Sequence, residues 1–276
     1  MNNAEGRSSV GGYLETLFSL EDKIILFTGA TGGLGSAICE SYAGAGASMA
    51  LCDIDEGKLA ELENKIKSAG GNASSYKLDL TRMEDIKDCV DRVIRACGRI
   101  DVLFNCAGIN KREGLLDVEE SAYDRIMQVN LKGLYFVSQE TAKHMIKERK
   151  GNIINMASHN SVGMLGGCSV YGATKSAVAA LTRSMAVEWA KYGIRANAIA
   201  PGHFLTPLTT VTWEHPTRGA YLSERIAMGR PGTAEEVLGT AILLASDASS
   251  YMSGMMVHID GGCLAGGAPW DFDTKY

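Results

Sequence analysis

The chain has 276 residues, of which 46% are hydrophobic, a composition that suits one large buried core and gives no sign of a second one. Its formal net charge of -5, with no basic stripe interleaved with aromatic residues, argues against nucleic-acid binding. The first residues hold no apolar run behind a basic start, so we expect neither a signal peptide nor a membrane anchor, and a cytoplasmic location.

Short apolar runs rich in β-branched residues alternate along the chain with longer stretches of helical periodicity. This alternation predicts an α/β fold, a doubly wound parallel sheet of about seven strands with helices on both faces. The predicted strands cover residues 23–28, 47–53, 74–78, 102–105, 152–157, 195–200 and 255–260. The predicted helices cover residues 33–45, 56–69, 82–97, 120–147, 169–192 and 234–246.

Three segments fall outside this alternation. Residues 1–19 are predicted to be a mobile N-terminal extension, ahead of a single domain over residues 20–265. Within that domain, residues 202–232 form a long insertion, and irregular insertions of this length act as lids or binding loops. Residues 266–276 form a C-terminal tail whose aromatic residues would dock onto a neighbouring subunit or over a cleft, or would simply fray.

The seven cysteines fall singly, with no C-x-x-C spacing, which predicts reduced thiols rather than a disulfide framework. The five histidines form no H-x-x-x-H pattern and have no cysteine at a metal-ligand spacing. We therefore expect no metal site.

The first predicted strand runs directly into the glycine-rich turn Thr28-Gly29-Ala30-Thr31-Gly32-Gly33-Leu34-Gly35, which opens a helix. Glycines here let the backbone approach a diphosphate, and the helix N-terminus supplies free N–H groups and partial positive charge. The glycine spacing is wider than the standard G-x-G-x-x-G fingerprint, and a glycine-rich turn alone fits a plain connection equally well.

The second predicted strand ends in Asp53, at the distance where a carboxylate can accept both hydroxyls of an adenosine ribose. The same carboxylate would repel a 2′-phosphate, and residues 30–36 contain no Arg or Lys that would attract one. This favours NAD over NADP. Alternatively, Asp53 caps the helix that begins at Glu56, and the two roles can coexist.

Tyr171 is the only one of ten tyrosines with a lysine four residues later, and both residues lie in a predicted helix. The spacing places the phenol and the Lys175 ammonium on one helix face, one turn apart. The cation would lower a phenolic pKa that starts near ~10, so that Tyr171 exchanges protons near neutral pH. Taken alone, the pair also fits a solvated surface pair.

Together these features carry a resemblance to the short-chain dehydrogenase/reductase family, which implies a Rossmann-like single domain. The glycine turn resembles that family's T-G-x-x-x-G-x-G, and Asn105-Cys106-Ala107-Gly108 resembles its N-N-A-G, with Cys106 in place of the second Asn. Pro201-Gly202 followed by Thr206 resembles its P-G-x-x-x-T, and Asp260-Gly261-Gly262 resembles its D-G-G. The residues that match the family's catalytic tetrad are Asn130, Ser158, Tyr171 and Lys175.

The resemblance implies an oxidoreductase that moves a hydride between NAD and a substrate carbon. Tyr171 would be the general acid in reduction and the general base in oxidation, Lys175 would bind the nicotinamide ribose, and Ser158 would hold the substrate oxygen. Asn130, a poor helix former in a long helix, would hold a local kink and a proton-relaying water. Alone, Ser158 fits a cap after its strand, and Asn130 fits a contact with a neighbouring loop.

The resemblance also implies the cofactor contacts. Asp79 would lie beside the adenine, or cap the following helix, and Asn105 would shape the turn beneath the cofactor. The predicted cofactor residues are Gly29, Thr31, Gly32, Gly33, Leu34, Gly35, Asp53, Ile54, Asp79, Leu80, Asn105, Ala107, Gly108, Tyr171, Lys175, Pro201, Gly202, Phe204 and Thr206.

Lys111 and Arg112 follow the cofactor strand where ligands enter an open α/β sheet, and this basic pair would grip a carboxylate or form a solvated turn. Residues 107–112 and 18–20 resemble the gluconate 5-dehydrogenase and 2-deoxygluconate dehydrogenase branch, which implies a sugar acid or polyol substrate. The predicted substrate residues are Ser158, His159, Lys111, Arg112, Cys168, Tyr171 and His203, with Trp213 as a further candidate.

Two other functions fit parts of the pattern. A 3-oxoacyl thioester reductase has the same fold, but Asp53 speaks against the NADPH that such enzymes use. A non-catalytic dinucleotide-binding sensor or scaffold would not need an intact Ser158, Tyr171 and Lys175. The resemblance also implies a homotetramer, paired through the two long helices, with Leu134, Phe136 and Val137 as candidates for either the interface or the core.

Overall fold

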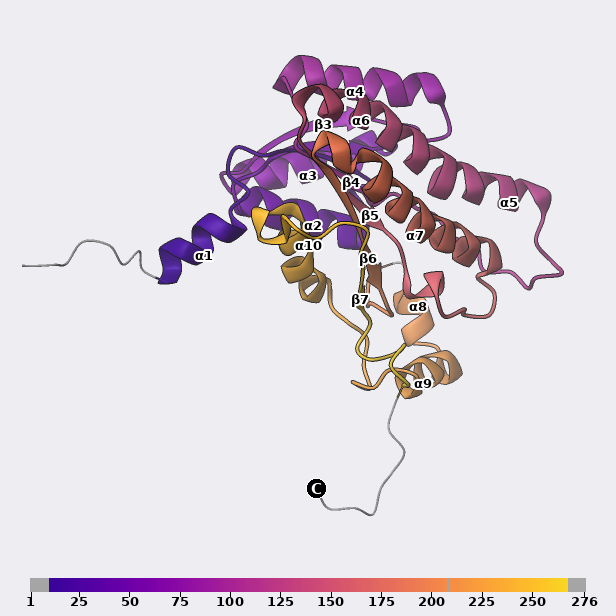
Figure 1. Cartoon of the computed structure of the whole chain (residues 1–276). Coiled ribbons are helices and arrows are strands. Elements are labelled where there is room, and N and C mark those ends of the chain that lie inside the picture. The colour runs from indigo at the N-terminus through magenta and orange to yellow at the C-terminus, as the bar shows by residue number, and fades with distance from the viewer. Residues whose placement is uncertain (1–9, 208, 268–276) are drawn as a thin grey trace, which may run out of the picture.

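The computed structural model describes residues 10–207 and 209–267, in which a parallel sheet lies between two layers of helices (Figure 1). The seven strands have the order β3-β2-β1-β4-β5-β6-β7, which confirms the predicted fold class. The order reverses between β1 and β4, and this reversal opens a crevice at the carboxyl ends of the strands. The strands are β1 Ile24–Thr28, β2 Ser48–Asp53, β3 Asn72–Lys77, β4 Val102–Asn105, β5 Gly151–Met156, β6 Ile194–Pro201 and β7 Met256–Ile259.

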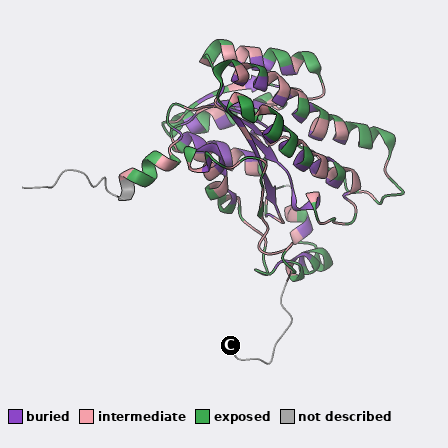
Figure 2. Ribbon diagram, viewed as in Figure 1, coloured by how far each residue is buried: buried purple, intermediate pink, exposed green. Residues whose placement is uncertain are grey.

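Each strand begins and ends within three residues of its predicted bounds, because burial on both faces makes a parallel strand a continuous apolar run. All residues of β4 and β5 are buried (Figure 2). At the two edges of the sheet, β3 has only two buried residues and β7 has none. Burial therefore decreases from the centre of the sheet to its edges.

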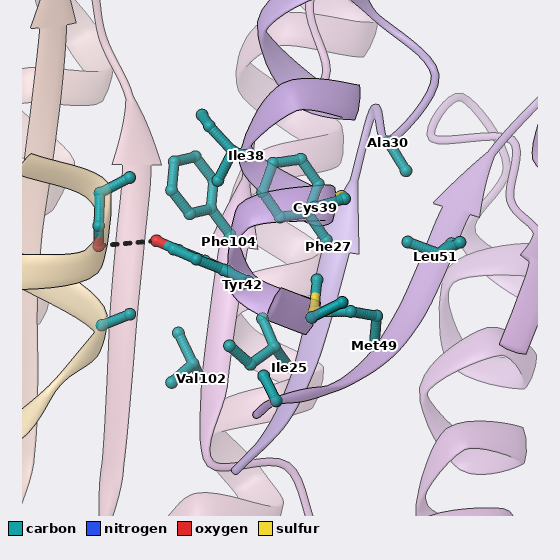
Figure 3. Close-up of a cluster of buried hydrophobic side chains, with 14 of the residues drawn as sticks. Ile25, Phe27, Ala30, Ile38, Cys39, Tyr42, Met49, Leu51, Val102 and Phe104 are labelled. Carbon is teal, nitrogen blue, oxygen red and sulfur yellow. Dashed lines mark hydrogen bonds between the residues drawn. The ribbon is translucent and has the colours of Figure 1, made fainter. Parts of the chain in front are cut away.

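Helices α2 (Gly33–Gly44), α3 (Glu56–Ser68) and α10 (Leu238–Ala245) pack on one face of the sheet. Figure 3 shows the centre of this layer, where Phe27 and Phe104 stack and the Tyr42 hydroxyl donates to the carbonyl of Ala241 over 2.8 Å. Helices α4 (Met83–Cys97), α6 (Leu134–Glu148) and α7 (Ser169–Trp189) supply the second core on the opposite face.

The long helix predicted over residues 120–147 is divided. Helix α5 (Glu120–Met127) passes into a π-helical segment, Gln128–Gly133, before α6 begins. Of the three apolar residues considered for an interface, Leu134 and Val137 are buried in the second core, and only Phe136 is partly exposed. The local distortion that was predicted at Asn130 is therefore present, as a π-helical segment. Such segments are frequent at functional sites.

The sequence pattern predicts no helix before β1 and none within residues 202–232, and the structure differs in both places. Helix α1 (Val10–Phe18) extends away from the sheet, and α8 (Thr210–Trp213) and α9 (Pro216–Glu224) lie next to each other in the insertion (Figure 1). The start of α9 has a local cause: Pro216 occupies its first turn, and His215 Nδ1 accepts the backbone N–H of Thr217 over 3.3 Å.

No helix within the described ranges is long and apolar enough to cross a membrane. All seven cysteines are free thiols, as predicted. Within the same ranges, no cluster of His, Cys, Asp and Glu side chains could hold a metal ion.

Candidate active site

A cavity of about 620 Å³ lies at the carboxyl ends of the central strands, where the strand order reverses. Of the predicted cofactor residues, it is lined by Gly29, Thr31, Gly32, Gly33, Leu34, Gly35, Asp53, Ile54, Asp79, Leu80, Ala107, Gly108, Tyr171, Pro201, Gly202, Phe204 and Thr206. Ser158 also lines it, whereas Asn105 and Lys175 lie behind its surface.

The glycine-rich turn is shaped by close backbone contacts. Gly29 has φ +71, and a Cβ there would lie 2.5 Å from the Cα of Ala107. A Cβ on Gly35 would collide with the Gly29 carbonyl oxygen. Gly32 is the N-cap of α2 and offers no capping side chain, so the first-turn N–H groups remain available to an anion. The turn therefore fits a dinucleotide diphosphate.

Asp53 presents its carboxylate to the same cavity. Its Oδ2 accepts from the backbone N–H of Thr31 over 3.1 Å and from the Thr31 hydroxyl over 2.8 Å, and its Oδ1 accepts from the N–H of Ile54 over 2.7 Å. The alternative role as a helix cap is wrong, because the N-cap of α3 is Asp55, whose Oδ1 accepts from the N–H of Lys58 over 3.1 Å. Asp53 thus fixes the glycine turn through hydrogen bonds and places a carboxylate at one end of the cavity.

Asp79 lines the same end of the cavity. Its Oδ1 accepts from the N–H and the hydroxyl of Thr81, over 2.9 and 2.7 Å. Partial burial raises its pKa, but the Thr81 bonds, together with the charges of Arg82 and Arg125, outweigh this and hold the pKa of Asp79 below its usual range. The alternative role as a helix cap is again wrong, since the N-cap of α4 is Arg82.

Asn105 is a structural residue in this fold. It is buried beneath the cavity, and its Nδ2 donates to Ser138 Oγ and Asn155 Oδ1, each over 2.9 Å. Its side chain therefore joins β4 to β5 and α6. The neighbouring Cys106 lines the cavity, and burial raises the pKa of its thiol to about 12, so the thiol stays protonated at neutral pH.

Ser158 and Tyr171 form the opposite end of the cavity. Ser158 lies two residues after the end of β5 and accepts the N–H of Asn160 over 3.1 Å, while Tyr171 lies in the first turn of α7. Lys175 is 2% exposed, and its Nζ lies 5.5 Å from the centroid of the Tyr171 ring and donates to the Met156 carbonyl. The three residues come from adjacent elements, which brings a hydroxyl, a phenol and an ammonium close together.

The predicted lowering of the phenolic pKa is wrong for this structure. Burial raises the pKa of Tyr171 to about 12, although Ser158 acts in the opposite direction. Burial also lowers the pKa of Lys175 to about 8. Both shifts have the same cause, since a low-dielectric site disfavours whichever form carries charge.

Asn130 lies in the π-helical segment and is fully buried. Its Nδ2 donates to the carbonyl of Ile109 over 2.9 Å, and its Oδ1 accepts the N–H of the same residue over 2.8 Å. Nδ2 also lies 3.3 Å from the Thr174 hydroxyl. Asn130 thus fixes the segment after β4 against α7, as its alternative role as a contact with a neighbouring loop predicted.

The predicted basic pair is separated. Lys111 is paired with Glu113 over 2.5 Å and with Glu119 over 3.6 Å, and these carboxylates raise its pKa. Arg112 has no carboxylate partner among the described residues and donates to the Thr212 hydroxyl over 2.7 Å. It lines a second hollow, of about 520 Å³, together with Arg218.

The remaining predicted substrate residues are buried or half-buried. Cys168 is buried and accepts from Asn110 Nδ2 over 3.4 Å. His159 follows Ser158 directly, and its ring packs against that of His203.

Sequence reasoning missed several residues that line the cavity. Arg125 and Val129 reach it from α5 and the π-helical segment, and the only available signal was their closeness to Asn130 in the chain. The other missed lining residues include Lys58, Thr81, Ile109 and Thr209.

The chain is similar to one protein family and to several known proteins. A family model described as enoyl-(acyl carrier protein) reductase matches residues 29–263. The chain is 40% identical to a 3-oxoacyl-[acyl-carrier-protein] reductase of Thermotoga maritima, over 89% of this chain and 99% of that one. It is 39% identical to a 2-dehydro-3-deoxy-D-gluconate 5-dehydrogenase of Bacillus subtilis, over 92% and 99%.

A solved structure with the same fold is a gluconate 5-dehydrogenase from Burkholderia cenocepacia in complex with NADP and tartrate. It superposes with a TM-score of 0.88 at 35% identity, over 91% of this chain and 99% of that one.

Proposed function

Because the chain belongs to the short-chain dehydrogenase/reductase family, we propose that it transfers a hydride between NAD and a secondary alcohol or ketone of a sugar acid or polyol. One observation carries the proposal: a single cavity has a glycine turn and a carboxylate at one end and a serine and a tyrosine at the other. The first pair suits a dinucleotide and the second suits the proton chemistry of an alcohol.

The residues divide the work of binding. N–H groups of the turn at residues 32–35 would hold the diphosphate, and Asp53 would accept the adenosine ribose hydroxyls. Asp79 would lie beside the adenine, and residues 201–206 would hold the nicotinamide, which supplies the carbon that accepts or releases the hydride. Lys175 would reach the nicotinamide ribose from behind the cavity wall.

Tyr171 would move the proton at its phenolic oxygen, and Ser158 would hold the substrate oxygen. With a pKa of about 12, the phenol is protonated at neutral pH, which suits the proton donor in carbonyl reduction. Alcohol oxidation requires the phenolate, and Lys175 supplies a cation 5.5 Å from the ring centroid to stabilise it. Asn130 would position this machinery by holding the segment at Ile109.

We propose NAD as the preferred cofactor because Asp53 places negative charge where a 2′-phosphate would lie. The NADP in the Burkholderia structure belongs to that protein. Initial rates with each cofactor at equal concentration test the preference, and a faster reaction with NADP would reject it.

The substrate class rests on the names of the relatives and on Arg112. A carboxylate could bind its guanidinium, which has no acidic partner in the described part of the chain. The Thermotoga relative favours a second candidate, a 3-oxoacyl thioester reductase. The deciding experiment offers the purified protein NAD with gluconate, 2-deoxygluconate or polyols, and NADPH or NADH with a 3-oxoacyl thioester. Turnover of the thioester alone would overturn the first assignment.

We also propose a homotetramer in the cytoplasm. A groove of about 660 Å³ lies over α5, α6 and α7, lined by apolar residues that include Tyr135, Phe136 and Leu181, and a second copy would cover it. Free thiols at all seven cysteines suit a reducing compartment. Light scattering on the purified chain tests the subunit number, and a monomer would reject it.

A further inference from the structure

Two histidines stand side by side at the carboxyl ends of β5 and β6. His159 directly follows Ser158, and His203 directly follows Gly202, so each is next to a residue that lines the cavity. Their ring centroids are 4.5 Å apart with an interplanar angle of 61°. The edge of Trp213 packs against His203, with the centroids 6.3 Å apart. The pair is therefore held in place by packing.

The ring nitrogens of this pair have no hydrogen-bond partner among the described residues. His159 is 7% exposed, and its Nδ1 is completely enclosed without a partner. Two other histidines are engaged: His215 Nδ1 accepts an N–H, and His144 Nε2 lies 3.8 Å from an Asp91 carboxylate oxygen. Leaving a buried polar group without a partner costs about 1 to 3 kcal/mol, so such groups in a native fold call for a functional explanation.

Both rings are neutral at neutral pH. Burial lowers the pKa of His159, and burial together with His159, Arg112 and Arg225 lowers the pKa of His203 to about 4. Asp260 acts in the opposite direction on both, but its carboxylate already accepts the N–H groups of Gly262 and Leu264, over 3.0 and 2.9 Å.

A neutral imidazole carries one donor and one acceptor, which is also what a hydroxyl group carries. An anionic group would instead be bound by cations such as Arg112, and an acyl chain would be bound by apolar walls. The chemistry of the pair therefore matches alcohol groups.

We propose that His159 and His203 form a hydroxyl-recognition site, which binds the hydroxyl next to the reacting carbon and so selects polyhydroxy substrates. The inference rests on the proposed function, because Ser158 must hold the reacting oxygen for its neighbour His159 to meet the adjacent one. The substrate class is then a vicinal diol within a sugar acid or polyol. A 3-oxoacyl thioester offers no such hydroxyl.

The test compares 2,3-butanediol with 2-butanol, a matched pair that differs in one hydroxyl, using His159→Phe and His203→Phe. Each substitution keeps a packed ring and removes both nitrogens. We expect kcat/KM for the diol to fall about 10- to 100-fold, mainly through KM, and that for 2-butanol to change less than about threefold. His203→Asn, which restores a donor and an acceptor, should recover part of the loss. His144→Phe, on α6 and away from the cavity, is the control and should leave kcat/KM unchanged for both substrates.

Equal losses with both alcohols would show that the rings only fill space, and an unchanged diol preference would show that they bind no hydroxyl; either result overturns the inference. Calorimetric titration of the protein–NAD complex with gluconate separates this from the proposed function. If the wild type turns over neither alcohol nor gluconate but binds gluconate at least tenfold more tightly than His203→Phe, hydride transfer fails and the recognition site stands. Equal gluconate binding by the two proteins, or none by the wild type, overturns the recognition site.

Discussion

At the ends of β2 and β3, the carboxylates of the cavity accept hydrogen bonds from nearby N–H groups and hydroxyls, whereas the imidazole rings that follow β5 and β6 have no such partner among the described residues. Asp53 accepts four hydrogen bonds, from Thr31, Ile54 and Asp55, and Asp79 accepts two from Thr81. No hydrogen bond reaches the rings of His159 and His203 within the described ranges, and Arg112 contacts only a hydroxyl. The cofactor half of the cavity is therefore fixed before any ligand arrives, whereas in the substrate half the two imidazole rings keep their hydrogen-bonding capacity unused.

This difference predicts different consequences for substitutions. A change in the cofactor half should disturb the backbone and reduce dinucleotide affinity for every substrate. A change in the substrate half should alter which substrate is used and leave the cofactor affinity intact.

The largest expected effect is that of Gly29→Ala, which breaks the shape of the cofactor half. The new Cβ would lie 2.5 Å from the Cα of Ala107 at a residue with φ +71. We expect NADH affinity, measured by calorimetry, to fall at least about 100-fold, with thermal stability also reduced. Gly44→Ala, at the end of α2, meets no atom within 4 Å and serves as the control. Wild-type affinity in Gly29→Ala would contradict the account.

Asp53→Asn sharpens the comparison, because it keeps the shape of the side chain and removes the charge. We expect the Kd for NAD to rise about 10- to 100-fold and the Kd for NADP to rise less, so that the preference for NAD shrinks. The control is Asp55→Asn, at the N-cap of α3, where Asn keeps an oxygen that can cap the helix. A cofactor preference that is the same in Asp53→Asn as in the wild type would refute the role of this carboxylate.

Lys175 lies between the two halves, and its burial links stability to pH. Its folded pKa of about 8 lies below its ordinary value of 10.5, so the unfolded chain binds more protons between these values and stability rises with pH there. At pH 7 the fold must bury the charge. Lys175→Met should therefore stabilise the protein by about 1 to 3 kcal/mol at pH 7, and less as the pH approaches ~10.

Urea unfolding at both pH values measures this change, with Lys87→Met, on the exposed side of α4, as the control. A destabilised Lys175→Met at pH 7 would show that the bond from Lys175 to the Met156 carbonyl outweighs the cost of burying its charge.

The smallest effect separates the two members of the basic pair. Arg112→Met should raise the KM for gluconate about tenfold and leave the KM for xylitol unchanged, because only gluconate carries a carboxylate. Lys111→Met should change neither by more than about twofold, since Lys111 is exposed and already paired with Glu113. If Lys111→Met has the larger effect on gluconate, the carboxylate binds elsewhere.

The sequence predicted the features that depend on local pattern. Continuous apolar runs such as β1 and β4 gave the strands, and Asn130 indicated the distortion between α5 and α6. Features that depend on tertiary packing were out of reach. The pairing of Lys111 with Glu113 could not be predicted from the sequence, and neither could the burial that raises the pKa of Tyr171. The four-residue spacing placed Lys175 near the Tyr171 ring, but only the fold shows that it binds the Met156 carbonyl.

The central claim is that the Tyr171 hydroxyl transfers the proton while a dinucleotide occupies the adjoining cavity. It is tested most directly by a single turnover of the preformed protein–NAD complex with the best sugar acid or polyol substrate, followed by NADH absorbance, in wild type and Tyr171→Phe. The account predicts that Tyr171→Phe binds NAD with wild-type affinity and forms NADH at least about 1,000-fold more slowly. NADH formation at the wild-type rate in Tyr171→Phe would contradict it.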